Sequence, residues 1–162
     1  MKIFSVLFLL FPLVAGAAGP GLVPGKSTVA DIEKKRPAEK RVVGGETVYY
    51  FPELPWGYVS YAARVGADGR LIAVEQRLTE ENVRKVVTGK TTGKEVRDLL
   101  GPPWEPIYYA RMQRNVWTYP MRIESDPTPK WFVVHISPDG MVRETYLFDD
   151  MNYNRFGGGR RR

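Results

Sequence analysis

One segment of this chain occurs twice, and this repeat constrains the fold more than any other feature of the sequence. Residues 25–32, Gly-Lys-Ser-Thr-Val-Ala-Asp-Ile, return as residues 89–96, Gly-Lys-Thr-Thr-Gly-Lys-Glu-Val. Each copy is followed by two matching features, an aromatic segment (48–51 and 116–119) and an Asp-Gly pair (68–69 and 139–140). The spacing between copies rises from 64 to 68 to 71, so the insertions lie in loops and the elements keep their order. The repeat predicts two similar units side by side, an arrangement more typical of a binding surface than of an active site.

The first 17 residues have the three-part composition of a secretory signal peptide. Lys2 is followed by an apolar run at 3–14, and Ala15-Gly16-Ala17 supplies the small residues of a cleavage site. The run is shorter than the roughly 20 apolar residues that a membrane-spanning helix needs. The chain contains no cysteine, so it lacks both disulfides and the thiol that anchors a bacterial lipoprotein. We therefore expect an exported, soluble, periplasmic protein without a lipid anchor.

The net charge of +6 is concentrated near the C-terminus. Residues 152–162, for which we expect a flexible basic tail, contain Arg155, Arg160, Arg161 and Arg162. The alternative role for this tail is to bind an anionic surface, because arginine pairs well with the phosphates of lipid headgroups or lipopolysaccharide. Nucleic acid is not an expected partner, since export separates the chain from it.

Capping and turn signals divide the rest of the chain into a first unit at 18–78 and a second unit at 79–151. In the first unit, Ser27 or Thr28 can cap a short helix, and strands are expected at 46–51, 57–65 and 70–78. In the second unit, one helix begins at Thr79 and is expected to run to Gly89, and a Thr92–Glu95 capping box begins another that ends at Gly101. Strands are expected at 115–122, 130–137 and 141–148, with hairpins turning at the two Asp-Gly pairs.

These elements predict an α+β fold with two tandem helix–helix–antiparallel-sheet units, the helices packed on one face of each sheet. The first unit begins with a Gly- and Pro-rich lead-in at 19–25, and its leading helix is expected to be missing or degenerate.

The second unit resembles the SmpA/OmlA family, the family of the outer-membrane assembly factor BamE. Members of that family have a helix ending in Leu-Gly-x-Pro, a Trp-x-Tyr strand and a late strand ending in Asp-Gly. The matching residues here are 100–103, Trp117 with Tyr119, and 132–140. The tandem form is also similar in plan to the secreted β-lactamase inhibitor protein. The resemblance implies an accessory role in outer-membrane protein assembly or envelope integrity, although the missing cysteine departs from the lipoprotein members.

Residues that carry chemistry are few. His135 is the only histidine, and it lies in an apolar strand without a recognisable nucleophile or acid partner. One histidine and no cysteine argue against a metal site, and the segment 88–92 lacks the Gly-x-x-x-x-Gly-Lys pattern of a phosphate-binding loop. We expect a protein that is not an enzyme and that has no cofactor.

The candidate binding residues lie on one face of the second sheet. If Phe132, Val134, Ile136 and Val142 face the helices, strict alternation turns the following residues outward: Trp131, His135, Arg143 and Thr145. An exposed sheet face with Trp, His and Arg has the composition of a protein-binding hot spot. The expected partner is an envelope protein, and the resemblance points to the outer-membrane assembly complex. The alternative function is inhibition of a periplasmic or extracellular enzyme through the same face.

Overall fold

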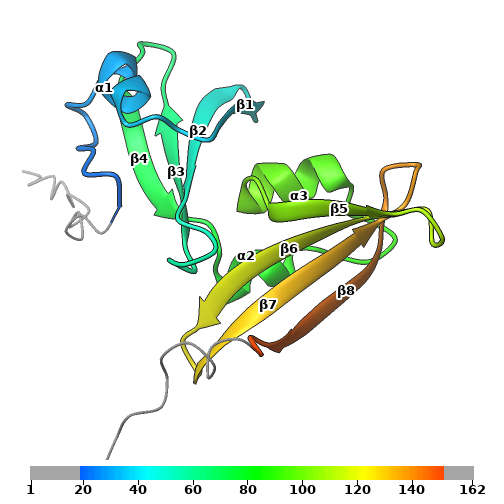
Figure 1. Ribbon diagram of the computed structural model, residues 1–162. Coiled ribbons are helices and arrows are strands. Elements are labelled where there is room, and N and C mark those ends of the chain that lie inside the picture. Colours follow the sequence, from blue (N-terminus) through cyan, green and yellow to red (C-terminus); the bar gives the residue numbers. More distant parts are fainter. Residues whose placement is uncertain (1–18, 152–162) are drawn as a thin grey trace, which may run out of the picture.

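The computed structural model describes residues 19–151 and arranges them as two four-stranded antiparallel sheets with three short helices (Figure 1). The predicted signal peptide at 1–17 and the basic tail at 152–162 lie outside the described residues. In chain order the elements are α1 (Val29–Lys34), β1 (Glu39–Val43), β2 (Glu46–Pro52), β3 (Ser60–Val65), β4 (Leu71–Gln76), α2 (Glu80–Arg84), α3 (Gly93–Leu100), β5 (Trp104–Tyr109), β6 (Arg114–Ile123), β7 (Asp126–Ile136) and β8 (Val142–Asp149). The first sheet has the order β1-β2-β3-β4 and the second has the order β5-β6-β7-β8.

The helices begin where the sequence predicts, because each start is fixed by a local hydrogen bond. The side chain of Thr28 caps α1 and that of Thr92 caps α3, and each forms a reciprocal capping box with the acidic residue three positions later, Asp31 or Glu95. The side chain of Thr79 caps α2 by accepting a hydrogen bond from the backbone N–H of Asn82. These capping predictions are confirmed.

The two units share a second set of contacts that closes each capped segment onto its own sheet. Gly25 N donates to Leu71 O at 2.8 Å, and Gly89 N donates to Val142 O at the same distance. In return, Leu71 N donates to Ser27 O, and Val142 N donates to Thr91 O. The segment before each helix is therefore fastened to the last strand of its unit in the same way, so the repeat in the sequence is a repeat in the structure.

The strand registers repeat as well. Tyr49 of β2 lies opposite Ala63 of β3, and Trp117 of β6 lies opposite Val134 of β7. The last hairpin of each unit carries a register shift at the matching place, between Arg64 and Val65 in the first sheet and between His135 and Ile136 in the second. A shift of this kind adds one residue to one strand and changes which side chains share a face beyond it.

The layers alternate between helix and sheet. Helix α1 covers one face of the first sheet, where Ile32 packs with Tyr49, Ala63 and Leu71. Helix α3 lies between the two sheets (Figure 1), and its Val96 and Leu100 pack with the core face of the second sheet. The largest core therefore belongs to the second unit, and it includes the Leu78 and Val86 side chains that flank α2.

The predicted fold class is wrong: the chain is mostly β, and it is not built from two helix–helix–sheet units. Each sheet has a fourth strand, β1 or β5, where no strand was predicted. The second unit's leading helix stops at Arg84 instead of running to the glycine at 89, and the first unit has a single helix in the described residues. Neither missed strand contains a fully buried residue, and the half-buried positions of β1 are Glu39, Arg41 and Val43, so neither sequence shows the apolar alternation that identifies a strand.

None of the helices in residues 19–151 combines the length and apolar character needed to cross a membrane.

Candidate protein-binding face

The two faces of the second sheet differ in what covers them. Phe132, Val134 and Ile136 of β7 point to the helix side and are buried in the core, as predicted. Trp131, Val133 and His135 alternate with them and therefore point to the other side. No helix in the described part of the chain packs over that second side (Figure 1).

We call this uncovered side the open face. Cross-strand partners in an antiparallel sheet share a face, so the open face can be followed from strand to strand through the register. Its margins carry four large apolar side chains that are about half exposed: Ile107 (46%), Tyr109 (45%), Tyr146 (48%) and Phe148 (44%). The remaining members of the face are Trp104, Arg114, Val116, Thr118, Pro120, Trp131, Val133, His135 and Glu144.

Ring contacts hold the aromatic side chains of the open face in place. The ring of Trp131 lies 5.8 Å from that of Trp104, edge to face, and 6.1 Å from that of Phe148. The ring of His135 lies 5.3 Å from that of Tyr146, also edge to face. Rings packed against one another lose little conformational freedom when a partner binds, so the face is preorganised for contact.

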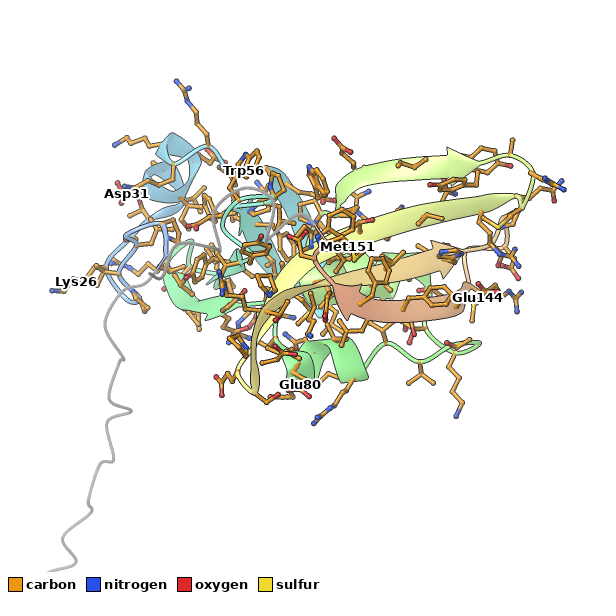
Figure 2. The ribbon with its side chains drawn as sticks, turned by 60° about the horizontal axis from the view of Figure 1, so that its bottom comes forward. Lys26, Asp31, Trp56, Glu80, Glu144 and Met151 are labelled. Atoms are coloured by element: carbon orange, nitrogen blue, oxygen red, sulfur yellow. The ribbon has the colours of Figure 1, made fainter. Side chains whose placement is uncertain are left out.

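The polar groups of the open face centre on Glu144, which lies on β8 (Figure 2). Its Oε2 atom accepts a 2.7 Å hydrogen bond from the hydroxyl of Tyr146 and lies 3.6 Å from Nδ1 of His135. The hydrogen bond to Glu144, together with the negative charge of that carboxylate, raises the pKa of Tyr146. A histidine, a tyrosine and a glutamate thus lie together, and each has a partner within the group.

The structure places two of the four predicted binding residues on the open face. Trp131 and His135 lie there. Thr145 lies opposite the buried Val134, so it points to the helix side. Arg143 stands at the register shift and donates from Nε to the Ser137 hydroxyl at 2.9 Å, and its guanidinium also pairs with Asp139. The prediction assumed that side chains alternate between faces without a break along β8. The extra residue at the register shift moves every later side chain to the face opposite the predicted one.

Sequence reasoning missed most of the apolar members of the open face. Ile107 and Tyr109 belong to the unpredicted strand β5. Tyr146 and Phe148 belong to the part of β8 whose side chains were predicted to point to the opposite face. A signal was available in the aromatic run at 107–109, which follows the Gly-Pro-Pro sequence that ends α3. The predicted anion-binding residues Arg155, Arg160, Arg161 and Arg162 lie outside the described residues.

The matching face of the first sheet is not open, because α3 of the second unit packs against it. Nε of Arg41 on β1 donates to the Asp98 carboxylate at 2.6 Å, and the hydroxyl of Tyr50 on β2 donates to the backbone carbonyl of Asp98 at 2.6 Å. An arginine of α3, Arg97, pairs in turn with Glu39 at 2.9 Å. The first sheet therefore uses this face to bind a neighbouring element.

A cavity of about 370 Å³ lies beside this junction, and its lining combines charged side chains with uncharged ones such as Val48 and Ala62. Arg64 pairs with Glu46 and Glu75, and Arg77 pairs with Glu75 at 2.8 Å. Asp98 is paired with Arg41 and Lys94. Because these charged side chains pair with one another, we interpret the cavity as part of the polar junction between the two units and not as a ligand site. Within residues 19–151, no group of three or more His, Asp or Glu side chains is arranged to hold a metal ion.

Comparison with known proteins adds little to this description. No family model matches the chain, and no curated protein matches it. Among solved structures, the chain is similar to a DUF4309 family protein (YjgB) from Bacillus subtilis subsp. subtilis str. 168. The two are 20% identical over 80% of this chain and 83% of that chain, with a TM-score of 0.32. A superposition this loose carries no argument about fold or function, and the resemblance to the SmpA/OmlA family stays a prediction.

Proposed function

We propose that this protein is a non-enzymatic protein-binding module that uses the open face of its second sheet. The observation that carries the proposal is the contrast between the two units. The equivalent faces of the two sheets differ in what covers them. The face of the first sheet is covered by α3, whereas that of the second sheet exposes Ile107, Tyr109, Tyr146 and Phe148. Large apolar side chains that are half exposed along both margins of a sheet face, around buried central residues such as Val116 and Val133, have the composition of a site that another protein covers.

The two equivalent faces also differ in chemistry, which indicates what kind of contact each one makes. On the first sheet, charged side chains such as Arg41 and Glu39 make ion pairs with α3. On the second sheet, Ile107 occupies the place of Arg41, because each lies opposite the valine of the next strand, Val116 or Val48. The open face is therefore suited to a partner with an apolar, aromatic-binding surface, and the polar His135–Tyr146–Glu144 group supplies the directional contacts.

The cellular role proposed for the module is that of an accessory factor in outer-membrane protein assembly or envelope integrity. This role rests on the export signal and on the residues that resemble the SmpA/OmlA family, and it places the protein in the periplasm. The basic tail would then hold the module near anionic lipid or lipopolysaccharide. Deleting residues 155–162 should weaken binding to anionic vesicles at low salt, and unchanged binding would remove the tail from this role.

Photo-crosslinking in intact envelopes tests the face directly. A photoreactive amino acid at position 107 should crosslink to a component of the outer-membrane assembly complex, whereas the same amino acid at position 108 should not. Ile107 and Tyr108 are neighbours of similar exposure on β5, but their side chains lie on opposite faces. Ile107→Lys should abolish capture of the complex by the tagged protein, and Tyr108→Lys should leave it unchanged.

Two results would overturn the proposal. Equal crosslinking from positions 107 and 108 would show that the open face is not the binding surface. The tagged protein could instead capture a single soluble enzyme, and Ile107→Lys could abolish that capture. This result would retain the open face as the binding surface but would make the protein an inhibitor.

A further inference from the structure

We propose that the protein forms a two-fold dimer in which the free edges of β8 from two copies pair antiparallel. The two sheets would join into one sheet of eight strands, with two open faces side by side. This proposal concerns the edge of the sheet, whereas the function proposed above concerns its face. Tyr146 and Phe148 contribute to both, and variants at Ile107 and Leu147 distinguish the two.

Strand β8 has the features of an edge that pairs with another strand. Within residues 19–151 it is the last strand of its sheet, and it pairs with β7 without interruption from Glu144 to Asp149. Three consecutive apolar residues near its end, Tyr146, Leu147 and Phe148, are each close to half exposed. Apolar side chains therefore flank the edge on both faces of the sheet. Natural proteins protect such an edge with proline, lysine or a bulge, and β8 has none of these over 144–149.

The opposite edge of the same sheet shows the protection that β8 lacks. Strand β5 contains Pro106, and its register shifts between Trp104 and Ile107. Glu105 has a φ of 43°, a left-handed conformation that breaks regular pairing. The asymmetry between the two edges points to β8 as the pairing edge.

The backbone direction of β8 is fixed by one hydrogen bond at its end. Asp150 N donates to Pro129 O at 2.8 Å, so the backbone of Asp150 points to β7. Backbone groups alternate in direction along a strand. The N–H and C=O groups of Thr145, Leu147 and Asp149 therefore point away from β7, to the free edge.

One register suits two copies of this edge. Centring the pair on Tyr146 places Thr145 opposite Leu147 of the second copy, with both pairs of outward backbone groups able to bond. It also brings Arg143, the extra residue at the register shift, level with Asp149 of the second copy at each end, so opposite charges approach each other twice. The Arg143 and Asp149 side chains are 43% and 63% exposed, so both remain accessible beside their internal partners.

The neighbouring registers are less favourable. Shifting the centre to Thr145 would place the second strand against Val142, whose backbone is already bonded to Gly89 and Thr91. Shifting the centre to Leu147 would place Thr145 opposite Asp149 and leave Arg143 beyond the end of the second strand, so both contacts between opposite charges would be lost. In the pairing centred on Tyr146, the second strand ends at Asp149, one residue short of Val142, and both charge contacts are kept.

Sedimentation velocity over low-micromolar to submillimolar concentration tests the dimer, with two variants of matched exposure. Leu147→Lys adds a charge at the pairing edge and should weaken the dimer about tenfold or more. Tyr108→Lys, on the same side of the same sheet but at the protected edge, should have no effect. Arg143→Asp and Asp149→Arg should each weaken the dimer, and the double variant should restore it.

Amide hydrogen exchange supplies a readout that does not depend on a variant folding correctly. The Leu147 amide should exchange more slowly as protein concentration rises, while the Tyr146 amide, which points to β7, should not change. A monomer at all concentrations would overturn the proposal. So would a dimer that is weakened by Ile107→Lys and not by Leu147→Lys, because that dimer would be formed by the open faces.

Discussion

Arg41 and Asp98 join the two units of this protein through a 2.6 Å hydrogen bond from Nε of the arginine to the carboxylate of the aspartate. Both side chains are largely shielded from solvent, at 20% and 13% exposure. Asp98 also receives a 2.7 Å contact from Lys94 on its own helix. One carboxylate of α3 therefore connects the second unit to the first. We expect the two units to unfold together in one cooperative transition.

Removing this connection should destabilise the whole protein. Asp98→Ala leaves Arg41 with only Glu39 as a partner, and we expect a loss of about 1–2 kcal/mol in the free energy of unfolding. Arg41→Met should cost a similar amount, and the double variant should cost less than the sum of both because the two residues interact. Urea unfolding measures these values. Additive losses would mean that the pair contributes nothing across the junction.

Gly101 should be intolerant of any side chain. Its φ of 86° and ψ of −168° belong to a region that only glycine occupies readily, and an added Cβ would lie 2.8 Å from the buried ring of Tyr50. We expect Gly101→Ala to cost about 3 kcal/mol or more, since strain and overpacking add. Gly89→Ala is the matched control, because Gly89 also has a positive φ but no atom within 4 Å of an added Cβ. It should cost about 1 kcal/mol. Equal losses in thermal unfolding would contradict the packing argument.

Stability should decline in acid through the carboxylates that the fold holds ionised. The backbone N–H and hydroxyl of Thr92 donate to Glu95 and lower the pKa of that carboxyl below its ordinary value of 4.5. A lowered pKa means that Glu95 contributes stability above pH 4.5 and loses it as the pH falls through the lower, folded value. Glu95→Gln should therefore flatten the decline in unfolding free energy below that pH. A slope identical to that of the unaltered protein would exclude this contribution.

In alkali the opposite dependence should follow from Tyr50. Burial raises the pKa of its hydroxyl to about 12, from an ordinary value of 10.0. A raised pKa means that the contribution of Tyr50 is fully present below pH 10 and is lost as the pH rises toward 12. Burial also raises the pKa of Tyr119, whose hydroxyl donates to Gly101 O at 3.2 Å. Ultraviolet titration should show tyrosines that ionise late, one fewer in Tyr50→Phe, and an unchanged late phase in that variant would contradict the assignment.

Some parts of this fold could be read from the sequence because they depend on neighbours only a few residues away. Thr28 and Thr92 cap their helices through bonds to residues three positions on, and both Asp-Gly pairs turn a hairpin. The alternation of Phe132, Val134 and Ile136 identified the buried side of β7 because the core is continuous there.

The candidate site was less predictable, for two physical reasons. Arg143 is an extra residue at the register shift after His135, so every later side chain in β8 points to the face opposite the one that simple alternation predicts. Thr145 was therefore assigned to the wrong face. Strands β1 and β5 are edge strands whose pairing depends on β2 and β6. Neither sequence shows apolar alternation, because two of the three half-buried positions of β1 are the charged residues Glu39 and Arg41, and β5 is exposed after Trp104.

The sequence by itself determined the repeated plan, the helix starts and the hairpin turns, since hydrogen bonds within a few residues fix each of them. Only the tertiary structure decided which sheet faces are covered. Helix α3 packs its Val96 on one sheet and pairs its Asp98 with the other, and no local pattern records that second contact. The open face around Trp131 exists because the chain supplies one such helix between two sheets, so one face of the second sheet is left without a covering helix among the described residues.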